Sequence, residues 1–218
     1  MNWAAKIEGD METPTQYFIS FERALVDARL LVRGVPIEKS NTSLQHLKVQ
    51  SFVLFAHAAM EEYLEAISWA VALDARKLFK DSGTICFSLV SLVASKLIGD
   101  LPEKAKKKLS QELVSNLDVF SDEALKRFRH VINENHGVTE DNQKALLLPI
   151  GIDPETFDLA LMNDLHAFGG RRGSIAHSFM LIRNELTLSD VNQKVEAIEA
   201  GLKKIDEAAC ELLQRRMP

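Results

Sequence analysis

The residues best suited to chemistry lie in one short stretch, FGGRRGSIAHSF, at positions 168–179. Arg171 and Arg172 carry planar, permanently charged groups that match a phosphate, and His177 can give or take a proton near neutral pH. The two adjacent glycines are expected to loosen the end of a preceding helix, and Gly173 to let backbone approach a ligand closely. These residues can bind a phosphodiester and move its protons, although an exposed arginine pair near a helix end is also common without any such role.

A second candidate group is His57 with Glu61, which stand four residues apart and share one face of a predicted helix. That spacing suits two metal ligands or an acid and base pair. No third ligand is evident, so the sequence favours a partly buried histidine beside a solvated glutamate. The lysine and arginine clusters at 103–108 and 126–130 are typical of solvated helix faces, with contact to nucleic acid as the alternative.

Composition limits the class of protein. The chain has 218 residues, of which 46% are hydrophobic, and a formal net charge of −5, which excludes a globally basic nucleic-acid coat. Cys86 and Cys210 lie in apolar stretches and are expected to be reduced core residues of a cytoplasmic protein. The longest apolar run, near 84–98, is too short to cross a bilayer, so we expect a buried helix there and no membrane partner.

Apolar residues recur every three or four positions along most of the chain, which predicts an all-α bundle of about six to eight helices. We expect a short N-terminal extension, 1–14, followed by a single helical domain, 15–218. The segment 137–153 breaks the periodicity and is expected to be a long loop. The predicted helices cover 18–32, 37–82, 84–98, 102–120, 121–136, 154–168 and 191–212.

The segment RGSIAH, Arg172 to His177, resembles the arginine-x4–6-histidine motif of the HEPN superfamily, whose members include many ribonucleases. Arg172 and His177 fill the two motif positions, whereas Gly173 replaces the usual polar residue. The motif is expected to start a helix late in the chain. AAMEEYLEA, at 58–66, is similar to the HEPN helix that carries acids near the active groove, which makes Glu61 or Glu62 a supporting residue. The subfamily that the chain resembles is the RiboL-PSP type.

This resemblance implies an endoribonuclease that needs neither a metal ion nor a cofactor. His177 would act as general base on a ribose 2′-OH or as general acid on the leaving 5′-oxygen, while Arg172, helped by Arg171, would stabilise charge on the phosphate. It also implies a homodimer with facing motifs, in a toxin or antiphage defence system with an antitoxin or sensor partner. The alternative is a catalytically inactive HEPN-like helical domain that dimerises or binds a partner, which Gly173 favours.

Overall fold

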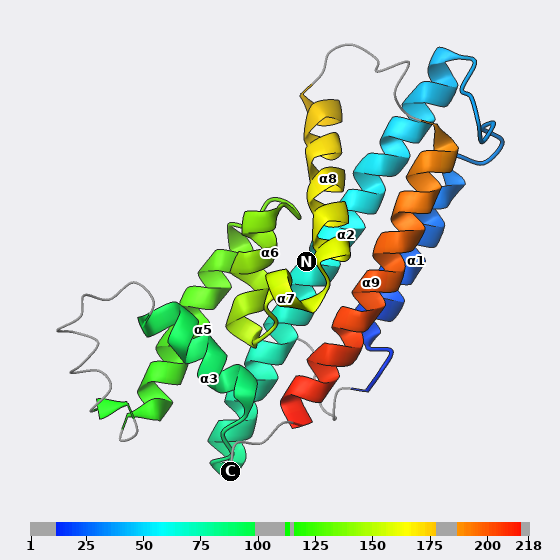
Figure 1. Ribbon diagram of the computed structural model, residues 1–218. Coiled ribbons are helices and arrows are strands. Elements are labelled where there is room, and N and C mark those ends of the chain that lie inside the picture. Colours follow the sequence, from blue (N-terminus) through cyan, green and yellow to red (C-terminus); the bar gives the residue numbers. More distant parts are fainter. Residues whose placement is uncertain (1–11, 99–111, 114–115, 178–186, 215–218) are drawn as a thin grey trace.

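The described residues form an all-α bundle, as the sequence predicts. The computed structural model describes residues 12–98, 112–113, 116–177 and 187–214, and over this part of the chain it contains eight α-helices and no strand (Figure 1). The helical elements are α1 (Gln16–Leu30), α2 (Ser43–Ser82), α3 (Phe87–Val93), the π-helix η1 (Ala94–Ile98), α5 (Leu117–Asn133), α6 (Glu140–Leu147), the 3-10 helix η2 (Leu148–Ile150), α7 (Pro154–Phe157), α8 (Leu159–Ala176) and α9 (Leu188–Gln214).

The central element is α2, whose 40 residues make a helix about 60 Å long. It begins with a capping box in which the Thr42 hydroxyl accepts from the Gln45 N–H and the Gln45 side chain accepts from the Thr42 N–H, both at 3.2 Å. It ends at Gly83, whose φ of +71° is a left-handed cap that favours glycine. The single long helix that the sequence predicts is therefore confirmed, with a start at Ser43.

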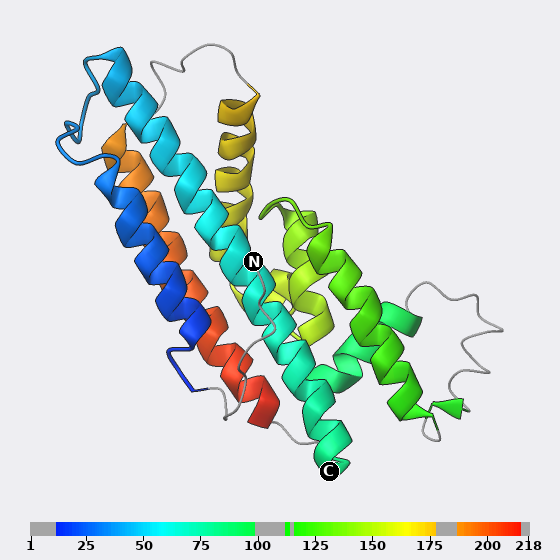
Figure 2. The ribbon, with the colours of Figure 1, turned by 180° about the vertical axis from the view of Figure 1, so that it is seen from behind.

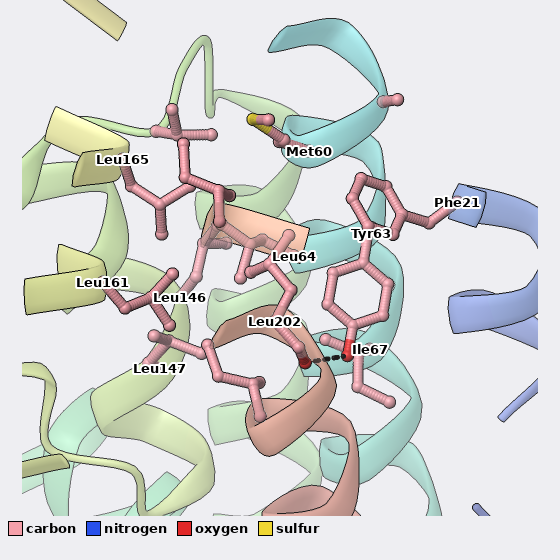
Figure 3. Close-up of a cluster of buried hydrophobic side chains, with 14 of the residues drawn as sticks. Phe21, Met60, Tyr63, Leu64, Ile67, Leu146, Leu147, Leu161, Leu165 and Leu202 are labelled. Carbon is pink, nitrogen blue, oxygen red and sulfur yellow. Dashed lines mark hydrogen bonds between the residues drawn. The ribbon is translucent and has the colours of Figure 1, made fainter. Parts of the chain in front are cut away.

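Helices pack against α2 from two sides. On one side α1 and α9 run along it, and on the other α3, α5, α6 and α8 contact it (Figures 1 and 2). Side chains on almost every face of α2 are consequently buried. Figure 3 shows part of the resulting core, in which side chains of α2 meet Leu146 and Leu147 of α6, Leu161 and Leu165 of α8, and Leu202 of α9.

A buried carboxylate joins three of these helices. Asp206 of α9 is 1% exposed, and its Oδ2 accepts from the Thr15 N–H at 2.8 Å while its Oδ1 accepts from the Thr15 hydroxyl at 2.5 Å. The Tyr63 hydroxyl of α2 also donates to Asp206 Oδ1, at 3.2 Å, and approaches the Leu202 carbonyl oxygen at 3.3 Å (Figure 3). Since Thr15 caps α1, this network sets how α1, α2 and α9 lie against one another.

The prediction of a long loop at 137–153 is wrong. Thr139 and Asn142 form a capping box that starts α6, and η2 follows directly. Leu146 and Leu147 are fully buried, so packing against the bundle stabilises a helix too short to show a clear period. Gly151, with a φ of +94°, then ends η2.

Two predicted helix boundaries are also wrong. Ser121 does not start a helix but lies inside α5, where its hydroxyl donates to the Asp118 carbonyl oxygen at 2.8 Å. The helix predicted over 154–168 is divided at Asp158, whose side chain accepts from the Leu161 N–H and caps α8. Most of the helix predicted over 102–120 lies outside the described residues, and the division into an extension and one domain stays a prediction.

The apolar segment near 84–98 forms α3 and η1 and buries Leu89, Leu92 and Val93 as expected. Across the described ranges, no helix has the length and apolar character that crossing a membrane requires. Cys86 and Cys210 are both buried free thiols, as predicted.

We expect the Asp206→Ala variant to lower the free energy of unfolding by about 3 kcal/mol, because it leaves the buried Thr15 and Tyr63 donors without their acceptor. Urea denaturation measures this change. Glu207→Ala, at an exposed neighbouring position on α9, is the matched control and should change stability little. Equal stability of the two variants would contradict a structural role for Asp206.

Candidate functional site

The RGSIAH motif lies at the C-terminal end of α8 and does not start a helix as predicted. Arg171 and Arg172 are half-buried in its last two turns, whereas His177 is exposed directly after the helix. The His177 N–H donates to the Gly173 carbonyl oxygen at 3.1 Å, which closes the helix end. The last two residues of the stretch 168–179 lie outside the described residues.

The glycines of this stretch do not loosen the helix, because α8 continues through all of them. Gly169 allows α8 to approach the segment before α6: a Cβ atom there would lie 3.5 Å from the side chains of Val138 and Thr139. A Cβ atom on Gly170 or Gly173 would meet no protein atom within 4 Å. The surface beside Gly173 is therefore not covered by the described protein.

Tertiary structure brings Arg172 to the acids of α2. Its guanidinium group acts electrostatically on both His57 and Glu61, and it lowers the pKa of each. No ion pair within 4.0 Å joins Arg172 to any described carboxylate, so the guanidinium donors stay available to another anion. Of the two acids that the resemblance suggests as supporting residues, Glu61 and Glu62, Glu61 is therefore the one on which the arginine of the motif acts.

His57 is a buried, neutral base. Its side chain is 2% exposed, and burial, followed by the charge of Arg172, lowers its pKa from 6.5 to about 4. The Nδ1 atom lies 3.4 Å from Glu61 Oε2, a distance that would make an ion pair if the ring were charged. Because the ring is neutral at pH 7, the contact is a dipolar one that orients both groups. The histidine is thus more buried than the sequence indicates.

Glu61 is not the solvated glutamate that the sequence favours, since its side chain is only 19% exposed. Burial raises its pKa, and the nearby Arg172 and His136 oppose that rise. A carboxyl group with a raised pKa exchanges protons closer to neutral pH than an exposed glutamate does. Glu61 is the acid of α2 whose environment Arg172 changes.

Glu62 faces a different part of the molecule. It is exposed, and it lines a pocket between α2 and α5. Neighbouring residues of a helix point about 100° apart, so adjacent acids on α2 serve separate surfaces. The structure therefore separates the two supporting residues proposed from sequence, with Glu61 near Arg172 and Glu62 in the pocket.

A polar segment between α5 and α6 completes the surroundings of Glu61, and sequence analysis missed it. Asn135 donates to Glu65 Oε1 at 2.7 Å and to the Gly137 carbonyl oxygen at 3.1 Å. Its own Oδ1 accepts from Asn142 Nδ2 at 2.9 Å. His136, the next residue, is exposed and acts electrostatically on Glu61. The only signal for this cluster is the run of polar residues at 133–136 before a glycine.

The structure gives less support to the other candidates, which are a metal site and the two basic clusters. Among the described residues, no group of three or more histidine, cysteine, aspartate or glutamate side chains could hold a metal ion. The basic cluster at 103–108 lies outside the described part of the chain. In the cluster at 126–130, Lys126 and His130 are exposed and Arg127 pairs with Glu123, so this run is largely a solvated helix face.

We expect replacement of His57 by glutamine to remove part of the acid sensitivity of folding. The pKa of His57 is lower in the folded state, so protonation favours the unfolded chain. The stability that neutral His57 contributes is complete above pH 6.5 and is lost as the pH falls towards 4, by about 1.4 kcal/mol per pH unit.

Urea unfolding at several pH values between 4.5 and 7.5 measures this contribution as the difference between the parent and His57→Gln curves. Other groups that titrate in this range cancel in that difference. His130→Gln, which alters an exposed histidine of α5, is the matched control. Parallel curves for the parent and the His57 variant would show that His57 is not held neutral.

Comparison with known proteins agrees with the helical architecture. The sequence profile of the RiboL-PSP-HEPN family matches residues 29–211, a range that includes Glu61 and Arg172. No curated protein and no solved structure matches the chain. Because the family profile covers far more than half of the sequence, the chain belongs to the RiboL-PSP-HEPN family.

Proposed function

We propose that this protein is a metal-independent endoribonuclease whose catalytic residues are Arg172 and His177. The observation that carries the proposal is the position of Arg172 in a chain of the RiboL-PSP-HEPN family: it is a half-buried cation that acts electrostatically on Glu61, and among the described residues it forms no ion pair within 4.0 Å. A guanidinium group with available donors suits the negative charge that grows on a phosphate during cleavage.

The proposed reaction needs only groups of the protein and the RNA. His177 takes the proton of a ribose 2′-OH, and the 2′-oxygen attacks the adjacent phosphorus. The bond from phosphorus to the 5′-oxygen breaks, a proton goes to that oxygen, and a 2′,3′-cyclic phosphate remains. Arg172, helped by Arg171, stabilises the charge on the phosphate oxygens, and Glu61 is the supporting acid of α2. DNA lacks the nucleophile and should resist.

The small number of proton-transfer groups in one chain favours a site shared between two chains. Arg172 lies in the last turns of α8, whereas His177 follows the last residue of that helix. Each chain thus supplies a single histidine at this helix end. In a two-fold homodimer with facing helix ends, a histidine of each chain supplies a base on one side of the phosphorus and an acid on the other.

A catalytically inactive, HEPN-like interaction protein is the second candidate. The observation in its favour is Gly173, which replaces the polar residue usual in the motif and offers no side chain to the open surface beside it. In either case we place the protein in the cytoplasm, within a toxin or antiphage defence system that includes an antitoxin or sensor partner.

We expect His177→Ala to lower RNA cleavage at least 100-fold, because the reaction loses its proton-transfer group. Its melting temperature should stay close to that of the parent, since His177 is exposed. Cleavage of labelled RNA in EDTA, with an otherwise identical DNA as a second substrate, measures the effect. His130→Ala, an exposed histidine on α5, is the control. Full activity of His177→Ala would exclude His177 as the catalytic residue, whereas no activity in the parent would favour the interaction protein.

We also expect specific activity to fall with dilution in parallel with the fraction of dimer, because one chain supplies only half of the proposed site. Sedimentation velocity and cleavage rates over the same concentration range test this. A monomer that cleaves RNA at full specific activity would exclude the shared site while leaving the chemistry itself intact.

A further inference from the structure

An elongated pocket lies between α2 and α5, on a face of α2 that the proposed cleavage mechanism does not use. The two helices run antiparallel here, because Arg76 pairs with Asp122 near one end of the pocket and Glu65 accepts from Asn135 near the other. The volume is about 1010 Å³, at the upper limit of small-molecule sites. The lining residues extend over about 27 Å of α2. A site of this length suits a segment of polypeptide.

The middle of the pocket is apolar and only partly covered. Trp69 and Leu73 of α2 and Leu125 of α5 line it, and each of these side chains is half-buried. The Arg129 guanidinium lies 4.6 Å from the centre of the Trp69 ring. An apolar groove between two helices is a surface on which a segment with one apolar face can bind, so further apolar side chains would be buried here.

The half of the pocket towards the end of α2 has available positive charge. Lys77 and Lys80 line it, both are exposed, and neither forms an ion pair within 4.0 Å among the described residues. Asp122 also lines this half, but it pairs with Arg76 at 2.7 Å. Acidic side chains of a bound segment would therefore find partners at the two lysines.

The start of α1 lies at this same half. Tyr17, in the first turn of α1, lines the pocket, and burial, followed by the charge of Asp74, raises its pKa. Burial also raises the pKa of Asp74 to about 6, and Lys77 opposes that rise, so Tyr17, Asp74 and Lys77 are neighbours. Residues 1–11 lie outside the described part of the chain. At no more than about 3.6 Å per residue, they can reach along the whole pocket from Tyr17.

The sequence of residues 1–11, MNWAAKIEGDM, matches the order of surfaces in the pocket. Its two acids, Glu8 and Asp10, are closest to α1 and hence to the lysines. Trp3 and Ile7 stand four residues apart, further from α1, where the apolar middle of the pocket can receive them. Tethering to α1 gives this segment an effective concentration in the millimolar range, which favours it over a second copy or a separate protein.

We propose that residues 1–11 bind in the pocket between α2 and α5, with the two acids at the lysines and with Trp3 against Trp69 and Arg129. The bound segment covers the apolar middle of the pocket, so any other protein that binds this surface must displace it. The proposal does not depend on RNA cleavage, since neither Arg172 nor His177 lines the pocket.

A disulfide between engineered cysteines tests the position of the segment. We expect Glu8→Cys/Lys77→Cys to form a bond within one chain at least tenfold faster than Glu8→Cys/Lys203→Cys, in which the second position is exposed on α9 outside the pocket. Both natural cysteines are buried. Non-reducing electrophoresis with mass spectrometry of the linked peptides measures the rates. Equal rates would refute the proposal, and a bond mainly between two chains would assign the pocket to a second copy.

Fluorescence tests the burial of Trp3, because Trp3 and Trp69 are the two tryptophans of the chain. In Trp69→Phe, which keeps an aromatic ring in the pocket, Trp3 is the remaining reporter. We expect acrylamide to quench it at least about threefold less efficiently than it quenches a free peptide of residues 1–12. Trp3 that is quenched as readily in the chain as in the peptide would contradict the proposal.

Exchange of charges tests the pairing of acids with lysines in the same Trp69→Phe background. Lys77→Glu/Lys80→Glu should raise the quenching of Trp3 towards that of the peptide, and adding Glu8→Lys/Asp10→Lys should restore the protection. Lysine reversal without effect, or exchange without restoration, would show that the segment does not bind as proposed. The matched control is Lys126→Glu/Lys203→Glu, at two exposed lysines outside the pocket, which should leave the quenching unchanged.

Discussion

Burial of α2 on almost all sides is the constraint on which the rest of the structure depends. An isolated helix of this length would expose apolar residues around its whole circumference, so it must be covered from more than one direction. The pair α1 and α9 covers one side, and the shorter helices cover the other. The polar positions of α2 that remain accessible lie between the helices that cover it, and the candidate sites are found at these positions.

The helical period of α2 distributes its acids between two surfaces. Arg172, near the end of α8, acts electrostatically on Glu61, whereas Glu62 and Glu65 border the pocket shared with α5. The polar turn around Asn135 contacts both regions, because it binds Glu65 directly and is followed by His136, which influences Glu61. One helix thus supports two chemically different environments without any long functional loop.

Two buried polar groups in this arrangement lose contact with water in different settings. His57 is neutral because it is desolvated and lies near the positive charge of Arg172. The neutral ring orients Glu61 and adds no second positive charge near Arg172. Asp206 is equally buried but receives hydrogen bonds from Thr15 and Tyr63, which replace the water that it loses.

Sequence by itself determined the all-α class, the long central helix, the buried cysteines, and the resemblance to HEPN domains through Arg172 and His177. These features depend on local periodicity and short motifs, which can be recognised within a short segment of sequence. Tertiary structure decided that the motif ends a helix, that 140–150 is helical, and that the charge of Arg172 acts on Glu61 whereas Glu62 lines the pocket. Those outcomes depend on which helices pack together. Packing joins segments that are far apart in the chain, and the local sequence pattern of neither segment indicates its partner.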